Sequence, residues 1–187
     1  MKSFVRFIVY SNIFVAFCVL GLSIGSEILL DTANYKLSQF VFFATLFTYN
    51  FQRIVRLSKT REHARKDWLN KNKLAIFFIV VISAIMSAFR FFDFKTNTQI
   101  IIVISGIISV SYPFGLREIP FSKIFIISLV WTVSTMLLLV LENNISFDSN
   151  ITLHLIGRFL FVLAITIPFD IRDIKFDKDT NLKTFWT

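Results

Sequence analysis

Residues 74–92 read LAIFFIVVISAIMSAFRFF, an apolar run whose only charged residue is Arg90. A helix of about 20 residues crosses the hydrocarbon core of a bilayer, so this run predicts a transmembrane helix. Similar apolar runs divide the rest of the chain. The six predicted spans are 4–24, 37–56, 74–92, 98–115, 121–141 and 152–170. The sequence therefore predicts an all-α, polytopic transmembrane bundle, with a single transmembrane domain across residues 1–187.

The composition agrees with a membrane protein, because 55% of the residues are hydrophobic and only 17% are charged. The net charge of +8 would suggest nucleic acid as the partner of a soluble protein. Here the basic residues gather between the apolar runs, as in cytoplasmic loops, so we expect a lipid bilayer and no nucleic acid.

The segment 53–73 sets the expected orientation. Its basic residues are Arg53, Arg56, Lys59, Arg61, Arg65, Lys66, Lys71 and Lys73, against Glu62 and Asp67. The positive-inside rule places this segment in the cytoplasm. With six spans, the N-terminus, the Arg117–Lys123 turn and the tail after Asp170 fall on the same side of the cell membrane. The linker that contains Glu27 falls on the opposite side.

Residues 168–187 read PFDIRDIKFDKDTNLKTFWT, and they place acids at Asp170, Asp173 and Asp177. Spacings of three and four residues bring all three carboxylates onto one stripe of a continuing helix. Such an oxygen-rich cluster suits a hard divalent cation such as Mg²⁺. We expect that cation to hold a phosphorylated ligand.

Two other predicted spans end in polar groups on the same side of the membrane. The second span ends with Asn50 and Arg53 on one helix face, and the fourth ends with Tyr112 before a Pro/Gly turn. Taken alone, the first is an interfacial helix end with Arg53 reaching the headgroups, and the second is a tight loop between helices. Together with the acidic stripe, the three helix ends predict the mouth of a cavity for a ligand with a charged head and an apolar tail.

The run DIRDIKFDKDTNLKT, residues 170–184, resembles the second Asp-rich motif of the UbiA-type intramembrane prenyltransferases. In that family a D/N-x-x-D-x-x-x-D pattern precedes a basic residue and Thr, which here are Lys183 and Thr184. Asn50 lies where the family has its first Asp-rich motif. The segment from Tyr112 to Lys123 is similar to the family's loop between helices four and five.

The resemblance implies a nine-helix bundle in which Mg²⁺ binds the diphosphate of an isoprenoid donor and a hydrophobic acceptor captures the prenyl cation. It implies metal-binding and catalytic roles for Asp170, Asp173 and Asp177. The residues that it implies for substrate binding are Asn50, Arg53, Tyr112, Arg117, Lys123 and Lys183.

The chain departs from the family in two respects. Ile54 and Ser58 stand where the first motif has its acids, and the chain stops at Thr187, before the last helices of the family. We therefore expect a fragment or a shortened homologue. Arg53 and Arg56 are candidates to replace a metal by pairing directly with phosphate oxygens.

Two function classes follow from this pattern. The first is a Mg²⁺-dependent prenyltransferase, and the second is a non-catalytic UbiA-like protein that binds lipid or assists a partner. A channel or transporter has less support, because Arg90 and Arg158 are the main ionisable residues within the predicted spans and both lie near the outer face.

Overall fold

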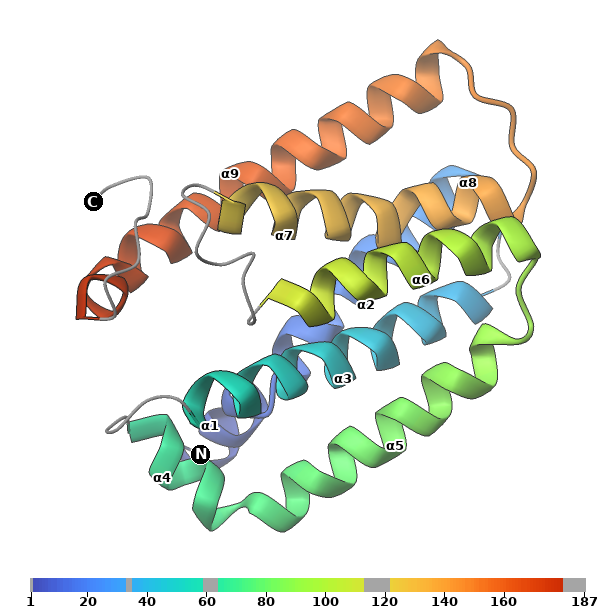
Figure 1. Cartoon of the computed structure of the whole chain (residues 1–187). Coiled ribbons are helices and arrows are strands. Elements are labelled where there is room, and N and C mark those ends of the chain that lie inside the picture. Colours follow the sequence, from blue (N-terminus) through green and yellow to red (C-terminus); the bar gives the residue numbers. More distant parts are fainter. Residues whose placement is uncertain (1, 33–34, 59–63, 113–121, 180–187) are drawn as a thin grey trace. The chain divides into compact units, whose positions relative to one another are not determined.

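The computed structural model describes residues 2–32, 35–58, 64–112 and 122–179 (Figure 1). The regular secondary structure in these ranges is helical, without a β-strand, which confirms the all-α prediction for this part of the chain. The helices are α1 Lys2–Tyr10, α2 Ile13–Leu29, α3 Lys36–Ser58, α4 Ala64–Lys71, α5 Lys73–Phe91, α6 Thr96–Ser111, α7 Ser122–Thr132, the π-helical turn η3 Val133–Leu137, α8 Leu138–Glu142 and α9 Ser149–Asp179.

Three described helical segments are long and apolar enough to cross a membrane, namely Lys73–Phe91, Lys123–Glu142 and Ser149–Phe169. The bent pair α1 and α2 would make a fourth if it acts as one span. Helix α6 is apolar but has 16 residues, or about 24 Å of helix, which is shorter than a typical bilayer core. The count of six spans therefore stays a prediction.

The first predicted span, residues 4–24, is not one helix. Helices α1 and α2 meet at a bend of 63°, and Asn12 at the junction has φ 61° and ψ 10°. Asn is one of the few residues other than Gly that adopt this left-handed conformation readily. The hydropathy pattern across the junction is continuous, so the apolar run alone predicted an unbroken span.

The chain divides into two compact units, Met1–Gln99 and Ile100–Thr187. In the first unit α3 packs against α2 and α5, with Val19, Val41 and Ile76 almost fully buried (Figure 1). In the second unit α7 packs against α9, and buried Val162 belongs to this core. Each unit thus has its own helical core.

Large apolar side chains cover the outer face of α5. Phe77, Phe78, Ile82, Ile85 and Phe89 each expose more than half of their surface. A soluble monomer rarely exposes a patch of this kind, whereas lipid tails solvate it well. The exposed face therefore agrees with a helix that contacts lipid.

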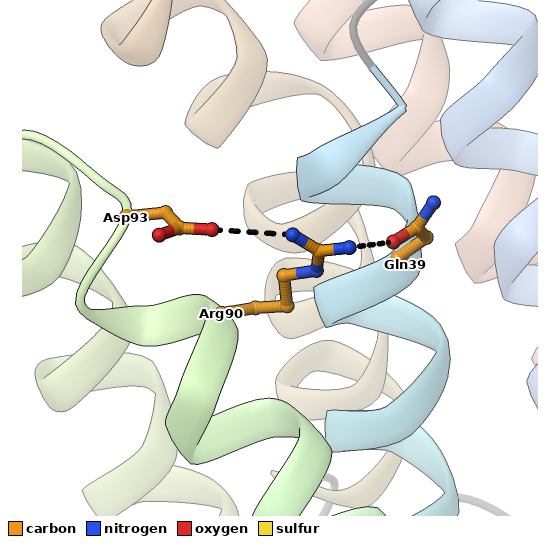
Figure 2. Close-up of polar contacts among 3 residues, drawn as sticks. All are labelled: Gln39, Arg90 and Asp93. Carbon is orange, nitrogen blue, oxygen red and sulfur yellow. Dashed lines mark hydrogen bonds and ion pairs between the residues drawn. The ribbon is translucent and has the colours of Figure 1, made fainter.

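Arg90, at the end of α5, links this helix to the beginning of α3. Its Nη1 atom lies 3.2 Å from Oδ2 of Asp93, and its Nη2 atom donates to Oε1 of Gln39 at 2.7 Å (Figure 2). Sequence analysis predicted only that Arg90 lies near the outer face. An exposed ion pair of this kind stabilises the fold by only about 0.3–0.5 kcal/mol.

Candidate functional site

A buried polar junction forms where the first apolar run breaks. The break leaves backbone carbonyls without helical partners, and apolar surroundings make such groups costly. Asn50 of α3 fills this need, because its Nδ2 atom donates to the carbonyl oxygens of Ser11 and Leu46, each at 2.8 Å. Its Oδ1 atom accepts from Nδ2 of Asn12 at 3.1 Å. We call Ser11, Asn12, Asn50 and Arg53 the break junction.

The bonding pattern determines the orientation of both amides. Asn50 faces two carbonyl oxygens, so its nitrogen must point toward them and its oxygen toward Asn12. Asn12 must then present its nitrogen to Asn50, which leaves Asn12 Oδ1 buried without a hydrogen-bond partner. Both side chains are only 1% exposed. The junction therefore holds one buried acceptor that the described protein atoms leave unsatisfied.

Arg53 lies one turn after Asn50 and reaches the same break. Its Nη1 atom donates to the carbonyl oxygen of Tyr10, the last residue of α1. A cation at a helix C-terminus also interacts favourably with the partial negative charge of the exposed carbonyls. Asn50 and Arg53 therefore lie on one face of α3, and both contact the break between α1 and α2, through the carbonyl oxygens of Ser11 and Tyr10.

The acidic stripe belongs to the other unit. Helix α9 continues past Pro168 to Asp179, so Asp170, Asp173 and Asp177 all lie on one helix. The side chains of these acids are outside the described set. Among the described side chains, no group of three or more His, Cys, Asp or Glu residues is arranged to hold a metal ion.

The structure describes only two of the four remaining predicted site residues. Tyr112 directly follows α6 and is buried, with 5% of its surface exposed. Lys123 is half-buried in the first turn of α7. Arg117 and Lys183 lie outside the described residues. The predicted site draws on both compact units, so its assembly from three helix ends stays a prediction.

Glu27 was assigned to a linker, but it lies inside α2 and is fully buried. The helix runs to Leu29, beyond the predicted end of the first span at residue 24. The Glu27 carboxylate accepts hydrogen bonds from Ser38 Oγ at 2.7 Å and from the backbone N–H of Tyr35 at 3.0 Å. It therefore caps the beginning of α3, where backbone donors have no helical partners. The available signal in the sequence was an acid nine residues before the helix start at Lys36.

Arg158 also has a partner that the sequence did not reveal. Its Nη1 atom donates to Thr135 Oγ1 at 3.3 Å, and the Thr135 hydroxyl donates to the Trp131 carbonyl at 2.6 Å. Thr135 lies in the π-helical turn η3, a feature that often marks a functional site. The sequence predicts only that Arg158 lies near the outer face. The contact depends on the packing of α7, which runs directly into η3, against α9.

Comparison with protein-family models, with curated proteins and with solved structures gives no match to this chain. Over residues 2–32, 35–58, 64–112 and 122–179 the fold defines an all-helical protein, with three helical segments that are long and apolar enough to cross a membrane. The resemblance of residues 170–184 to a prenyltransferase motif therefore rests on the residues themselves.

Proposed function

We propose that this protein is a UbiA-like membrane protein that binds an isoprenoid diphosphate with Mg²⁺ and transfers its prenyl group to a hydrophobic acceptor. The observation that carries the proposal is the D-x-x-D-x-x-x-D pattern at Asp170, Asp173 and Asp177, followed by Lys183 and Thr184. The continuation of α9 through all three acidic positions supports it, because one helix repeats these positions on one side.

The proposed donor set fits Mg²⁺ chemically, since carboxylate oxygens are the ligands that this hard cation prefers. Asp170, Asp173 and Asp177 would hold the metal, which neutralises charge on the diphosphate when it is bound. The basic residues Arg117, Lys123 and Lys183 would bind diphosphate oxygens. Tyr112 would lie near the head group of the donor.

The proposed reaction breaks the bond between the prenyl carbon and the diphosphate oxygen, and the bonding electron pair leaves with diphosphate. A carbon of the acceptor forms the new bond to the allylic cation and then loses a proton. The apolar helices would keep water away from that cation. The test is transfer of a labelled prenyl diphosphate in membranes, compared between the parent chain and its Asp173→Ala variant.

The break junction favours a second candidate, a non-catalytic UbiA-like protein that binds lipid or assists a partner. Asn50 would act as a metal or phosphate ligand in the enzyme, yet its amide here bonds to Asn12 and to two carbonyl oxygens. Ile54 and Ser58 replace the other expected acids. Mg²⁺-dependent binding of prenyl diphosphate without transfer would support this second candidate.

Arg53 and Arg56 allow a test of whether arginine side chains replace a metal ion in binding the diphosphate. We expect the Arg53→Ala/Arg56→Ala variant to bind prenyl diphosphate about tenfold more weakly, because two guanidinium groups that pair with phosphate oxygens are removed. The measurement is equilibrium binding of labelled diphosphate to purified protein. The Lys71→Ala/Lys73→Ala variant removes the same charge and should bind like the parent. Unchanged binding by the arginine variant would exclude direct pairing.

The proposed orientation places the N-terminus and the acidic stripe on the cytoplasmic side. Cys18 is the single cysteine, so a Cys18→Ser chain accepts new labelling sites. We expect a membrane-impermeant maleimide to label Asn97→Cys in intact cells, but Ser3→Cys only after the membrane is opened. Both positions are exposed in the structure. The reverse pattern would show that the N-terminus faces outward.

A further inference from the structure

We propose that α1 and α4 together form a surface that lies in the headgroup layer and binds anionic lipid. This α1–α4 surface consists of residues 2–10 and 64–73, which all belong to the unit Met1–Gln99. It shares no residue with the acidic stripe or with the residues proposed for prenyl transfer.

The direction of α1 differs from that of a membrane-spanning continuation of α2. The two helices are bent by 63° at the break junction. If α2 stands across the bilayer, a helix turned by this angle lies closer to the membrane plane than to the membrane normal. Hydrogen bonds from Asn50 to Ser11 and from Arg53 to Tyr10 hold this bend in place.

Helix α1 has the two faces that an interfacial helix requires. Phe4, Val5 and Val9 are exposed apolar residues, with 69%, 54% and 40% of their surface accessible. Arg6 and Tyr10, which are four residues apart, share a different side of the same helix. An amphipathic helix of this kind buries its apolar face at the boundary between headgroups and acyl chains.

Trp68 joins α4 to this helix. Its ring packs edge-on against Phe7 and Tyr10, with ring centroids 5.7 Å and 5.3 Å away. Asn72 Nδ2 donates to the Trp68 carbonyl at 2.8 Å, which ties the end of α4 to the turn before α5. Trp and Tyr are enriched at membrane interfaces, so this aromatic cluster suits a position at the headgroup level.

The net positive charge of the α1–α4 surface indicates what kind of partner it binds. Its described charged side chains are the exposed Arg6, Lys71 and Lys73 and the single acid Asp67. Basic residues beside a membrane attract anionic headgroups. A polyanion in water would leave Phe4, Val5 and Val9 exposed, whereas a lipid surface takes up both the charge and the apolar face. Anionic lipid is therefore the partner that fits both features.

The test uses the full chain in vesicles with Trp68 as the reporter. The changes Trp131→Phe and Trp186→Phe leave Trp68 as the single tryptophan. We expect lipids brominated near the glycerol end of the acyl chain to quench Trp68 more strongly than lipids brominated near the terminal methyl. Brominated phosphatidylglycerol should quench more strongly than brominated phosphatidylcholine at equal fraction.

Charge removal then tests the lipid preference. Each basic side chain near an anionic surface raises affinity about fivefold, so Arg6→Gln/Lys71→Gln should lower the preference for phosphatidylglycerol by about 25-fold. The matched control, Lys36→Gln/Lys95→Gln, removes two exposed cations at the other end of α3 and should keep the preference. Strongest quenching from the bilayer centre, absence of quenching, or an equal loss in both variants would overturn the proposal.

Discussion

Asp173→Asn is expected to abolish Mg²⁺-dependent prenyl transfer, with a loss of at least about a hundredfold in rate. Asp173 is the central acid of the stripe, between Asp170 and Asp177 on α9. The substitution keeps the size of the side chain and removes one charged metal ligand. The remaining two carboxylates would hold Mg²⁺ more weakly, so less charge on the leaving diphosphate would be neutralised.

The measurement is transfer of a labelled prenyl group in membranes, together with Mg²⁺-dependent binding of labelled prenyl diphosphate. Asp179→Asn is a matched control, because it removes an acid from the same helix outside the motif spacing. It should retain transfer and binding near the parent level. Binding that is equal in the parent and in Asp173→Asn would contradict the metal site itself.

The two proposed functions separate in the same experiment. A prenyltransferase shows transfer in the parent chain that disappears with Asp173→Asn or with a Mg²⁺ chelator. A non-catalytic relative shows Mg²⁺-dependent binding with transfer at background. Failure of both assays in the parent chain would remove the diphosphate site and leave the anionic-lipid proposal, which rests on residues 2–10 and 64–73, unaffected.

Asn50→Ala is expected to destabilise the fold by about 2–4 kcal/mol, because it leaves several buried polar groups without partners. The Ser11 carbonyl and the Asn12 amide each lose a hydrogen bond that Asn50 provides. Asn50 is 1% exposed, so water does not replace those bonds readily. The loss should appear as a lower midpoint in thermal unfolding of the purified protein.

Asn70→Ala provides the control for this prediction, since Asn70 is exposed on α4. It should change stability by less than about 0.5 kcal/mol. The Asn12→Ala change and the double variant complete a cycle, in which the two losses should be smaller together than their sum, because they share one hydrogen bond. An Asn50→Ala protein with parental stability would show that the break does not depend on this amide.

The helices were largely predictable because their signal is local. Residues 74–92 form α5 almost as predicted, since an apolar run of this length has its backbone groups satisfied within one helix. Helix α9 likewise passes through Pro168, which costs one backbone donor but does not end the helix. The position of Asp170, Asp173 and Asp177 on one helix could be predicted from the sequence for the same reason.

The partners of the polar residues were not predictable, because those partners come from distant segments. Asn12 bonds to Asn50 across 38 residues, and Arg158 bonds to Thr135 across 23 residues. From the sequence, Asn50 is expected in a ligand site and Glu27 in a linker. The structure shows Asn50 at a helix break and Glu27 at the beginning of α3.

The amino-acid sequence by itself determined the helical class, the approximate limits of most apolar helices and the spacing of the acids at residues 170–184. These features depend on hydrophobicity and on helix periodicity, which act over a few turns. Only the tertiary structure decided that the first apolar run bends at Asn12, and which groups Asn50, Arg53 and Glu27 satisfy. A buried polar group needs a hydrogen-bond partner, and the packing between helices determines which group lies close enough to be that partner.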